Sequence, residues 1–318
     1  MEEKILETLK NTTRYCILGA TGYIGSYLYD RMKDDGLHVI GSSRVPQTSY
    51  FKFNVQDEDY CPQEFLEDKR KKIVIICFAQ AKIDQCRLDY DNAYEINVSG
   101  TLELIHKLSN DGCKVIAFSS DNVFGDNRGN YTEQDVLSPV NQYGAMKAEL
   151  ERRIQRNYPE TLVFRLPKVI GTEMRTPNLL AEYLVKMERG EIHYAIKDSK
   201  MSVVSLEDLY QIIIRACGLD LSGLYQVSSD KSYSRADLAN IFFAMLGLEE
   251  EVVEKEVKEF HFRDNRPRRM NMINDKIASA TGYQFQDYES MVSVFIKRNR
   301  DQISEIIRKR EERRYESK

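Results

Sequence analysis

Three glycines, each three residues apart, follow a short apolar segment near the start of the chain. The segment Arg14–Leu18 has the pattern of a β-strand, and Gly19, Gly22 and Gly25 come directly after it, where a helical pattern over Tyr23–Asp34 begins. Glycines at this spacing let the backbone turn tightly, approach a pyrophosphate and pack a helix against a strand. The amides at the start of that helix then face the phosphates. The order strand, glycine turn, helix therefore predicts a dinucleotide site on a parallel α/β sheet.

Strand and helix patterns continue to alternate through the first half of the chain, which is typical of βαβ units. Further strands are expected at His38–Gly41, Ile73–Phe78, Lys114–Phe118 and Leu162–Arg165, and further helices at Asp89–Leu108 and Asn141–Gln155. We therefore predict an α/β fold with a Rossmann-type doubly wound parallel sheet. Residues 1–166 are expected to form its dinucleotide-binding domain.

After Pro167 the expected elements become shorter and less regular. They are the strands Val203–Val204 and Leu224–Val227, a helix that a Ser205 capping sequence starts and that runs to Ala216, and a helix over Ser234–Leu246. We expect residues 167–318 to form mainly a smaller mixed α/β substrate lobe and a C-terminal helix, with residues 202–220 returning to the first domain. The charged tail Lys297–Lys318 is expected to be a solvated helix with an apolar stripe of Ile303, Ile306 and Ile307. A helix that binds a partner is the alternative.

Composition and charge exclude several classes of protein. The 318 residues carry 46 Lys and Arg against 50 Asp and Glu, a net charge of −4, so nothing attracts the chain as a whole to nucleic acid. The longest apolar run, Ile73–Ala79, is too short to cross a membrane, and no secretory signal opens the chain. None of the six cysteines has metal-ligand spacing. We therefore expect no metal site, reduced thiols and a cytoplasmic location.

The end of the second predicted strand indicates which dinucleotide is bound. The strand runs into Ser42, Ser43 and Arg44, and no carboxylate follows before Asp57. A protein that binds NAD usually has an acidic residue here, which holds the ribose 2′-hydroxyl. A guanidinium beside hydroxyls suits a 2′-phosphate instead. NADP(H) is therefore expected in preference to NAD(H), with a merely solvated Arg44 as the alternative.

A tyrosine and a lysine four residues apart are the candidates for chemistry. Tyr143 and Lys147 fall on one face of a predicted helix, and Ser120 follows the end of a predicted strand. A neighbouring ammonium, together with an oxidised nicotinamide, should lower the pKa of the phenol from its usual value near 10. The pair could then exchange a proton with a carbonyl or alcohol oxygen. Such a pair is common on surface helices, and it becomes specific only beside the glycine motif and the serine.

These motifs resemble the extended short-chain dehydrogenase/reductase superfamily, in its nucleotide-sugar branch. The subgroup of dTDP-4-dehydrorhamnose reductases is the most similar. The likeness covers nearly the whole chain and includes Ile83–Cys86, Asn97–Thr101, Ser119–Phe124, Leu224–Val227 and Arg266-Pro267.

The resemblance implies a role for each matching residue. Ser120 would polarise a substrate carbonyl, Tyr143 would be the general acid, and Lys147 would bind the nicotinamide ribose. The implied cofactor-binding residues are Gly19, Thr21, Gly22, Tyr23, Ile24, Gly25, Ser43, Arg44, Asn54, Val55, Phe78, Ala79, Gln80, Tyr143 and Lys147. The implied substrate-binding residues are Asp121, Val123, Lys168 and Arg266.

One departure from the branch narrows the reaction. Dehydratases of the branch carry an Asp-Glu pair after the catalytic hydroxyl, whereas Asn122 follows Asp121 here and cannot shuttle a proton. The expected function is thus an NADPH-dependent reductase of a 4-keto nucleotide sugar, in a homodimer. A nucleotide-sugar epimerase or dehydrogenase with the same three residues remains an alternative. So does a non-catalytic, NADP-binding regulatory subunit.

Overall fold

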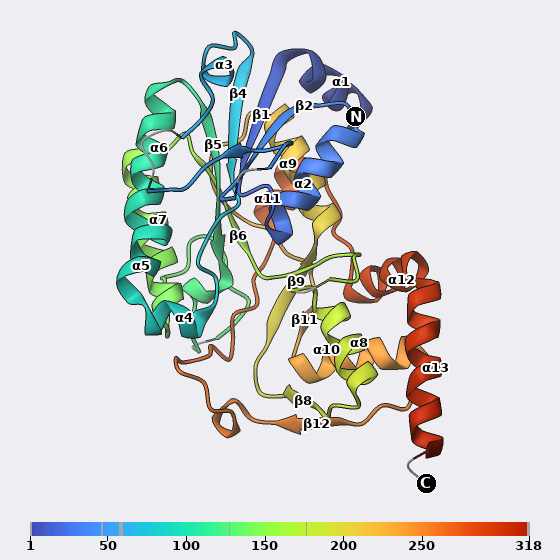
Figure 1. Ribbon diagram of the computed structural model, residues 1–318. Helices are drawn as coiled ribbons and strands as arrows, with labels where there is room; N and C mark the ends of the chain where they lie inside the picture. Colours follow the sequence, from blue (N-terminus) through green and yellow to red (C-terminus); the bar gives the residue numbers. More distant parts are fainter. Residues whose placement is uncertain (1, 46, 57–59, 127, 176, 317–318) are drawn as a thin grey trace.

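A parallel sheet forms the centre of the computed structural model, which describes all residues except 1, 46, 57–59, 127, 176 and 317–318 (Figure 1). Within the described residues it has seven strands in the order β10-β6-β5-β4-β1-β2-β3. They are β1 (Thr13–Leu18), β2 (His38–Ser43), β3 (Phe51–Lys52), β4 (Lys71–Ile76), β5 (Lys114–Ser120), β6 (Leu162–Leu166) and β10 (Gly223–Gln226). The strand order reverses at β1 and β4, the point where doubly wound sheets bind ligands. The predicted α/β, Rossmann-type fold is confirmed.

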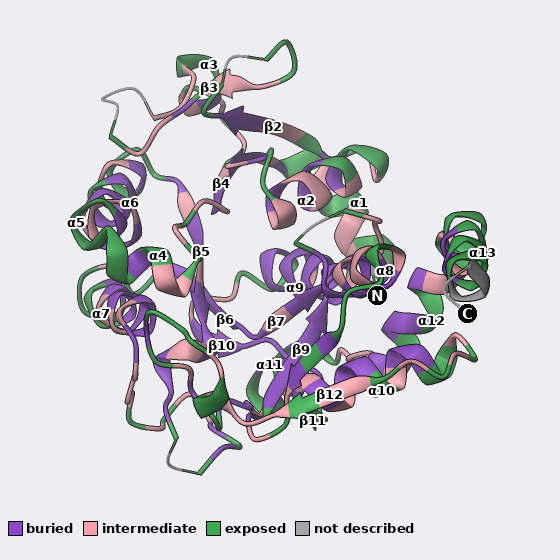
Figure 2. Ribbon diagram, turned by 60° about the horizontal axis from the view of Figure 1, so that its bottom comes forward, coloured by how far each residue is buried: buried purple, intermediate pink, exposed green. Residues whose placement is uncertain are grey.

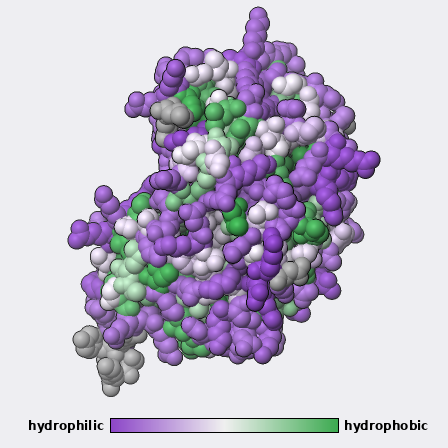
Figure 3. Space-filling view, turned by 180° about the vertical axis from the view of Figure 1, so that it is seen from behind, coloured by the Kyte–Doolittle hydropathy of each residue, from purple (hydrophilic) through white to green (hydrophobic). Residues whose placement is uncertain are grey.

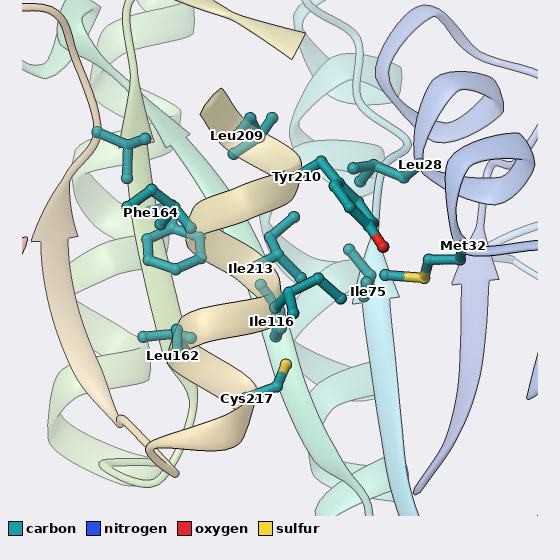
Figure 4. Close-up of a cluster of buried hydrophobic side chains, with 14 of the residues drawn as sticks. Leu28, Met32, Ile75, Ile116, Leu162, Phe164, Leu209, Tyr210, Ile213 and Cys217 are labelled. Atoms are coloured by element: carbon teal, nitrogen blue, oxygen red, sulfur yellow. The ribbon is translucent and has the colours of Figure 1, made fainter. Parts of the chain in front are cut away.

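Helices cover both faces of this sheet. One face carries α1 (Glu2–Thr12), α2 (Tyr23–Asp34) and α9 (Leu206–Gly218), and the other carries α6 (Gly100–Asn110) and α7 (Gln142–Asn157). Side chains alternate along each strand, so Ile73 and Ile75 of β4 pack in the α9 cluster while Val74 and Ile76 pack in the α7 cluster. Figure 4 shows Leu209, Tyr210 and Ile213 of α9 in the first of these clusters.

The helix expected over residues 89–108 has a π-helical turn in its middle. It consists of α5 (Tyr90–Tyr94), the turn Glu95–Ser99 and α6, preceded by α4 (Ile83–Leu88). A π turn accommodates an extra residue within a helix, and such turns often lie at functional sites. Here Asn97 of the turn bonds the backbone of Gln80: its Oδ1 accepts from the Gln80 amide at 3.0 Å, and its Nδ2 donates to the Gln80 carbonyl at 2.9 Å.

A smaller lobe of mixed α/β structure lies beside the carboxyl end of the sheet (Figures 1 and 2). Its strands are β7 (Lys168–Ile170), β9 (Met201–Ser205) and β11 (Ser232–Tyr233) in one sheet, and β8 (His193–Ile196) and β12 (Val252–Lys255) in another. Its helices are α8 (Leu179–Arg189), α10 (Arg235–Met245), α12 (Tyr288–Arg298) and α13 (Arg300–Glu316).

The chain passes between the two lobes more often than the sequence suggested. The strand at residues 224–227 was expected in the smaller lobe, but β10 pairs with β6 at the edge of the central sheet. Within the stretch 202–220, α9 packs on the central sheet, whereas β9 pairs with β7 in the smaller lobe. The division of the chain into two domains at residue 166 stays a prediction.

The C-terminal helix is docked along one side. Ile303 and Ile306 of α13 are buried and pack with α8 and α12, while the charged Glu305, Arg308 and Lys309 are exposed. Most charged side chains of the described helix are thus solvated, as expected, and its apolar stripe packs against the smaller lobe. Seen from behind, the surface is largely hydrophilic with scattered apolar patches (Figure 3), and none of the described helices is long and apolar enough to span a membrane.

Candidate active site and dinucleotide site

The glycine turn after β1 has a backbone shape that side chains would disrupt. Gly19 has φ of +89°, a conformation that favours glycine, and its carbonyl accepts a hydrogen bond from the Gly22 amide at 3.0 Å. A Cβ at Gly25 would lie 2.2 Å from the Gly19 carbonyl oxygen. The turn is therefore packed directly under the first turn of α2, as close helix–strand packing requires.

The start of α2 is prepared for an anion. Its N-cap is Gly22, no side chain caps it, and its first turn carries no acidic residue. Thr21 and Gly22 are exposed, so the free amides of the first turn are open to a ligand. Free amides and the helix dipole together attract a pyrophosphate. Both the cradle that a Cβ would fill and the uncapped helix fit a dinucleotide, and Ile24 and Gly25 belong to the same turn.

The side chain of Tyr23 points elsewhere. A Cβ at Gly171 would lie 2.6 Å from the Tyr23 hydroxyl oxygen, so the ring packs under the loop that follows β7. Burial raises the pKa of this phenol. Tyr23 therefore offers the dinucleotide site its backbone, while its side chain connects α2 to the smaller lobe.

The serine that supports the glycine turn is the neighbour of the predicted one. Ser42 Oγ accepts a hydrogen bond from the Gly19 amide at 2.9 Å, whereas Ser43 Oγ accepts from the Val45 amide at 3.2 Å. Both serines are buried, and Arg44 directly after them is exposed. The sequence pattern alone did not distinguish the two hydroxyls, because their distances from Gly19 depend on the pairing of β1 with β2.

The other predicted cofactor residues lie around the same edge of the sheet. Asn54 and Val55 follow β3 and are half-buried. Phe78 packs against Phe53 with ring centroids 5.5 Å apart. Ala79 is exposed, and the backbone of Gln80 is held by Asn97. Their assignment to a cofactor stays a prediction.

Ser120 lies at the carboxyl end of β5, in a short hydrogen-bonded network. Its hydroxyl donates to Asp121 Oδ1 at 3.0 Å and accepts from the Asn122 amide at 3.2 Å. The following 3₁₀ turn Asp121–Val123 leads the chain away from the sheet. This network fixes the position of the serine oxygen.

Tyr143 and Lys147 lie on the inner face of α7, which Asn141 caps through a 2.8 Å bond from the Gly144 amide to its Oδ1. Both side chains are buried, at 9% and 5% exposure. Lys147 Nζ lies 6.0 Å from the centre of the Tyr143 ring and donates to the Phe118 carbonyl at 2.9 Å. The structure therefore brings the predicted pair together beneath the end of β5.

Gly144 is a site residue that sequence reasoning missed. A Cβ at this position would lie 2.0 Å from the Asn122 carbonyl oxygen, so α7 touches the turn after Ser120 without any intervening side chain. This close approach is what places Tyr143 beside Ser120. The signal in the sequence was a glycine in the first turn of a predicted helix, where a cap does not need one.

Burial controls the charges at this site. Burial raises the pKa of the Tyr143 phenol, and the hydrogen bond with the Ser120 hydroxyl lowers this pKa by a smaller amount. The lowering expected from Lys147 together with an oxidised nicotinamide stays a prediction for the cofactor complex. In the structure, the Lys147 ammonium bonds the Phe118 carbonyl, and burial lowers its own pKa to about 8. The phenol is therefore protonated at neutral pH, the state in which a general acid must begin.

Asp121 is the acidic group of the site, and burial raises its pKa to about 6 despite hydrogen bonds from Ser120 and Asn122. Because the pKa is higher in the folded than in the unfolded chain, ionised Asp121 destabilises the fold, and its contribution to stability falls as pH rises from about 4 to about 6.

We expect Asp121→Asn to be more stable than the parent at pH 8, by at most roughly 3 kcal/mol, and to lose this advantage near pH 4. Urea unfolding of both proteins at several pH values measures the difference. A difference that does not change with pH would contradict the raised pKa.

The predicted substrate residues are divided between two places. Val123 is buried beside Phe124, and the charge of Lys168, at the start of β7, interacts with that of Asp121. Burial and the neighbouring Arg235 lower the pKa of Lys168 to about 8. Arg235 begins α10 and was missed, because only the packing of the smaller lobe on the sheet brings it here.

Arg266 has other partners. Its Nη1 lies 2.9 Å from Asp84 Oδ1, and its guanidinium stacks 4.2 Å from the centre of the Phe262 ring. It lines a cavity of about 630 Å³ that excludes Ser120, Tyr143 and Lys147. The cavity has more cationic than acidic side chains and is lined by Arg87, Asp126, Val140, Val257, Lys258, Phe260, Phe262, Arg263, Asp264, Asn265, Arg266 and Arg268. A role for Arg266 in substrate binding stays a prediction.

The loop that contains Arg266 also completes the start of α7. Asp264 Oδ2 accepts from the Gln142 amide at 2.9 Å, and the Asn265 carbonyl accepts from Asn141 Nδ2 at 3.1 Å. The smaller lobe thus contacts the residue next to Tyr143. Among the described residues, no three His, Cys, Asp or Glu side chains gather as a metal site would require.

Curated relatives of at least two kinds match the chain. The β subunit of methionine adenosyltransferase 2 from Rattus norvegicus is 26% identical over 189 residues, which is 59% of this chain and 55% of that protein. The chain therefore spans about half the length of these relatives. A probable low-salt glycan biosynthesis reductase from Haloferax volcanii is 23% identical over 249 residues, covering 76% of this chain and 83% of that protein.

Solved structures share the fold. A dTDP-4-dehydrorhamnose reductase from Bacillus anthracis, in complex with NADP, has a TM-score of 0.78 at 22% identity and covers 90% of this chain and 99% of that one. A UDP-glucose 4-epimerase from Thermotoga maritima has a TM-score of 0.74 at 17% identity, covering 91% and 99%. The RmlD substrate binding domain family matches residues 13–300. With nearly its whole length matched, the chain belongs to this RmlD family.

Proposed function

We propose that this protein is an NADPH-dependent reductase of a 4-keto nucleotide sugar. The observation that carries the proposal is the joint placement of the glycine turn, Ser120, Tyr143 and Lys147. Because β1, β4 and β5 are adjacent and parallel, the turn after β1 and the serine at the end of β5 lie at one edge of the sheet. Membership of the RmlD family supports the substrate class.

Each residue has a distinct part in the proposed reduction. When bound at the glycine turn, the cofactor supplies a hydride to the keto carbon. The Ser120 hydroxyl orients the substrate oxygen, and the protonated Tyr143 phenol donates its proton to that oxygen. The Lys147 ammonium stabilises the phenolate that this transfer leaves behind. Water elimination would need a second carboxyl group after Asp121, and the amide of Asn122 at that position cannot transfer a proton.

The proposal is tested by following NADPH oxidation with a panel of 4-keto sugars attached to different nucleotides. Stoichiometric consumption of NADPH with one of these substrates supports a reductase. A tightly retained cofactor that is not consumed, together with interconversion of sugar epimers, would show an epimerase instead. No turnover of any member of the panel would refute both.

The preference for NADPH rests on Arg44, which is exposed beyond the buried Ser42 and Ser43. The Bacillus anthracis relative, whose structure contains NADP, is consistent with it. We expect Arg44→Ala to weaken NADPH binding by about 10- to 100-fold, because the substitution removes a hydrogen bond from a charged group to the 2′-phosphate. NADH has no 2′-phosphate, so its binding should be nearly unchanged. Titration of both dinucleotides measures this, with the exposed Lys69→Ala, before β4 at the opposite end of the sheet, as control. Equal losses of NADPH and NADH binding would remove the 2′-phosphate assignment.

A regulatory subunit is the second candidate, favoured by the likeness to the methionine adenosyltransferase β subunits. Co-purification with a larger enzyme whose affinity changes with NADP would support it. The buried, ordered arrangement of Ser120, Tyr143 and Lys147 supports the reductase, because a binding module needs no such network. The homodimer and the cytoplasmic location stay predictions.

A further inference from the structure

Helix α7 carries a third polar side chain on its inner face. Glu151 follows Lys147 by four residues and Tyr143 by eight, so the three side chains lie one above another on one face of the helix. Glu151 is the most deeply buried of them, at 1% exposure. The proposed mechanism gives this carboxylate no task, although burying a charge is costly unless it is paired.

Its partner is Arg165, which comes from β6. Arg165 Nε lies 3.0 and 3.1 Å from the two Glu151 oxygens, and Nη2 lies 2.8 Å from Oε2. Arg165 is 2% exposed, and its guanidinium lies 5.0 Å from the centre of the Phe124 ring. Such a forked contact holds Glu151 ionised and in one orientation. A well-packed apolar pair of similar volume would often be as stable, so stability alone does not explain the pair.

The Glu151 carboxylate lies one helical turn from Lys147 on the same face of α7. Lys147 bonds the Phe118 carbonyl of β5 and faces the Tyr143 ring of α7 and the Cys86 thiol of α4. Burial lowers the pKa of its ammonium, and the negative charge of Glu151 is the main influence that opposes this. The charge of Asp264 raises the pKa of the Cys86 thiol, and Asp264 is thus linked to Lys147 only through Cys86.

We propose that Glu151, held by Arg165, is a positioning residue that keeps the buried Lys147 ammonium charged beside Tyr143. It touches neither substrate nor cofactor in this scheme and acts only through Lys147. Its effect on turnover rests on the proposed function, whereas its effect on the charge of Lys147 does not.

The direct test is an NMR titration of the cofactor-free protein with ¹³Cε-labelled lysine. The Lys147 signal is assigned from its loss in Lys147→Arg. In Glu151→Gln we expect the Lys147 titration midpoint to fall by about one pH unit or more, a tenfold change in proton affinity. Glu149→Gln, on the same helix but bonded to Tyr94 and Arg153 near the surface, is the matched control and should leave Lys147 unchanged. An unchanged midpoint in Glu151→Gln overturns the proposal.

A second variant guards against misfolding, because Glu151→Gln leaves Arg165 buried without its partner. The double variant Glu151→Gln/Arg165→Met removes both charges and keeps similar volumes. The Lys147 midpoint should fall in it as well, and a midpoint equal to that of the parent overturns the proposal.

Kinetics separate this inference from the proposed function. In the reductase, the alkaline limb of kcat/KM should move to lower pH in the double variant, since activity is lost as Lys147 loses its proton. A purely structural role would lower activity without moving the limb. If the Lys147 midpoint falls in the variants but the parent protein reduces no keto sugar, the inference stands and the proposed function fails. If the parent protein reduces a keto sugar but the Lys147 midpoint does not move in the variants, the proposed function stands and the inference fails.

Discussion

Replacing Tyr143 by phenylalanine is expected to lower kcat for keto-sugar reduction by about 10²- to 10⁴-fold, the usual contribution of a positioned general acid. The phenol is buried next to Ser120 and protonated at neutral pH, and the substitution removes only its oxygen. Binding of NADPH should be nearly unchanged, because the glycine turn and the start of α2 remain intact.

Turnover by stopped-flow or steady-state assay and NADPH titration by fluorescence check both parts of this expectation. Tyr94→Phe is the matched control: its hydroxyl bonds Glu149 outside the site, so kcat should stay within about twofold of the parent value, an effect under 0.5 kcal/mol. Substantial activity in Tyr143→Phe would exclude the phenol as the acid.

The second large effect is expected from Gly144→Ala. The added methyl carbon would lie 2.0 Å from the Asn122 carbonyl oxygen, so α7 and the turn after Ser120 must move apart. We expect a loss of stability of about 1–3 kcal/mol, as overpacking costs, and a fall in kcat on the order of 100-fold, because Tyr143 moves away from Ser120.

A control separates the two consequences. Gly190→Ala is placed at the left-handed C-cap of α8 with nothing within 4 Å of the new carbon, so it should reduce stability without lowering kcat. Thermal unfolding and kinetics of both variants make the comparison. A Gly144→Ala protein with the parent kcat would show that the close approach of α7 does not position the tyrosine.

Sequence patterns predicted correctly those features of the structure that depend on residues close together in the chain. The glycine turn predicted β1, α2 and the parallel sheet, because Gly19 and Gly25 are required by backbone geometry within seven residues. The four-residue spacing likewise predicted that Tyr143 and Lys147 share a face of α7.

What the sequence did not predict depends on contacts between distant segments. The Gly19–Ser42 bond, the pairing of Arg266 with Asp84 and the approach of Arg235 to Lys168 each join elements far apart in the chain. The raised pKa of Tyr143 in the structure was not predicted either, since burial is a property of the packed fold.

The hydrogen bonds from Asp264 and Asn265 to the first residues of α7 bear on any attempt to divide this protein. A truncated chain ending near residue 166 would retain the glycine turn but lack the groups that bond the first residues of α7. Such a fragment, if it folds, should bind a dinucleotide yet leave the tyrosine end of that helix frayed. Reconstituting catalysis from separately expressed halves would then require the second half to supply a missing helix cap as well as a binding surface.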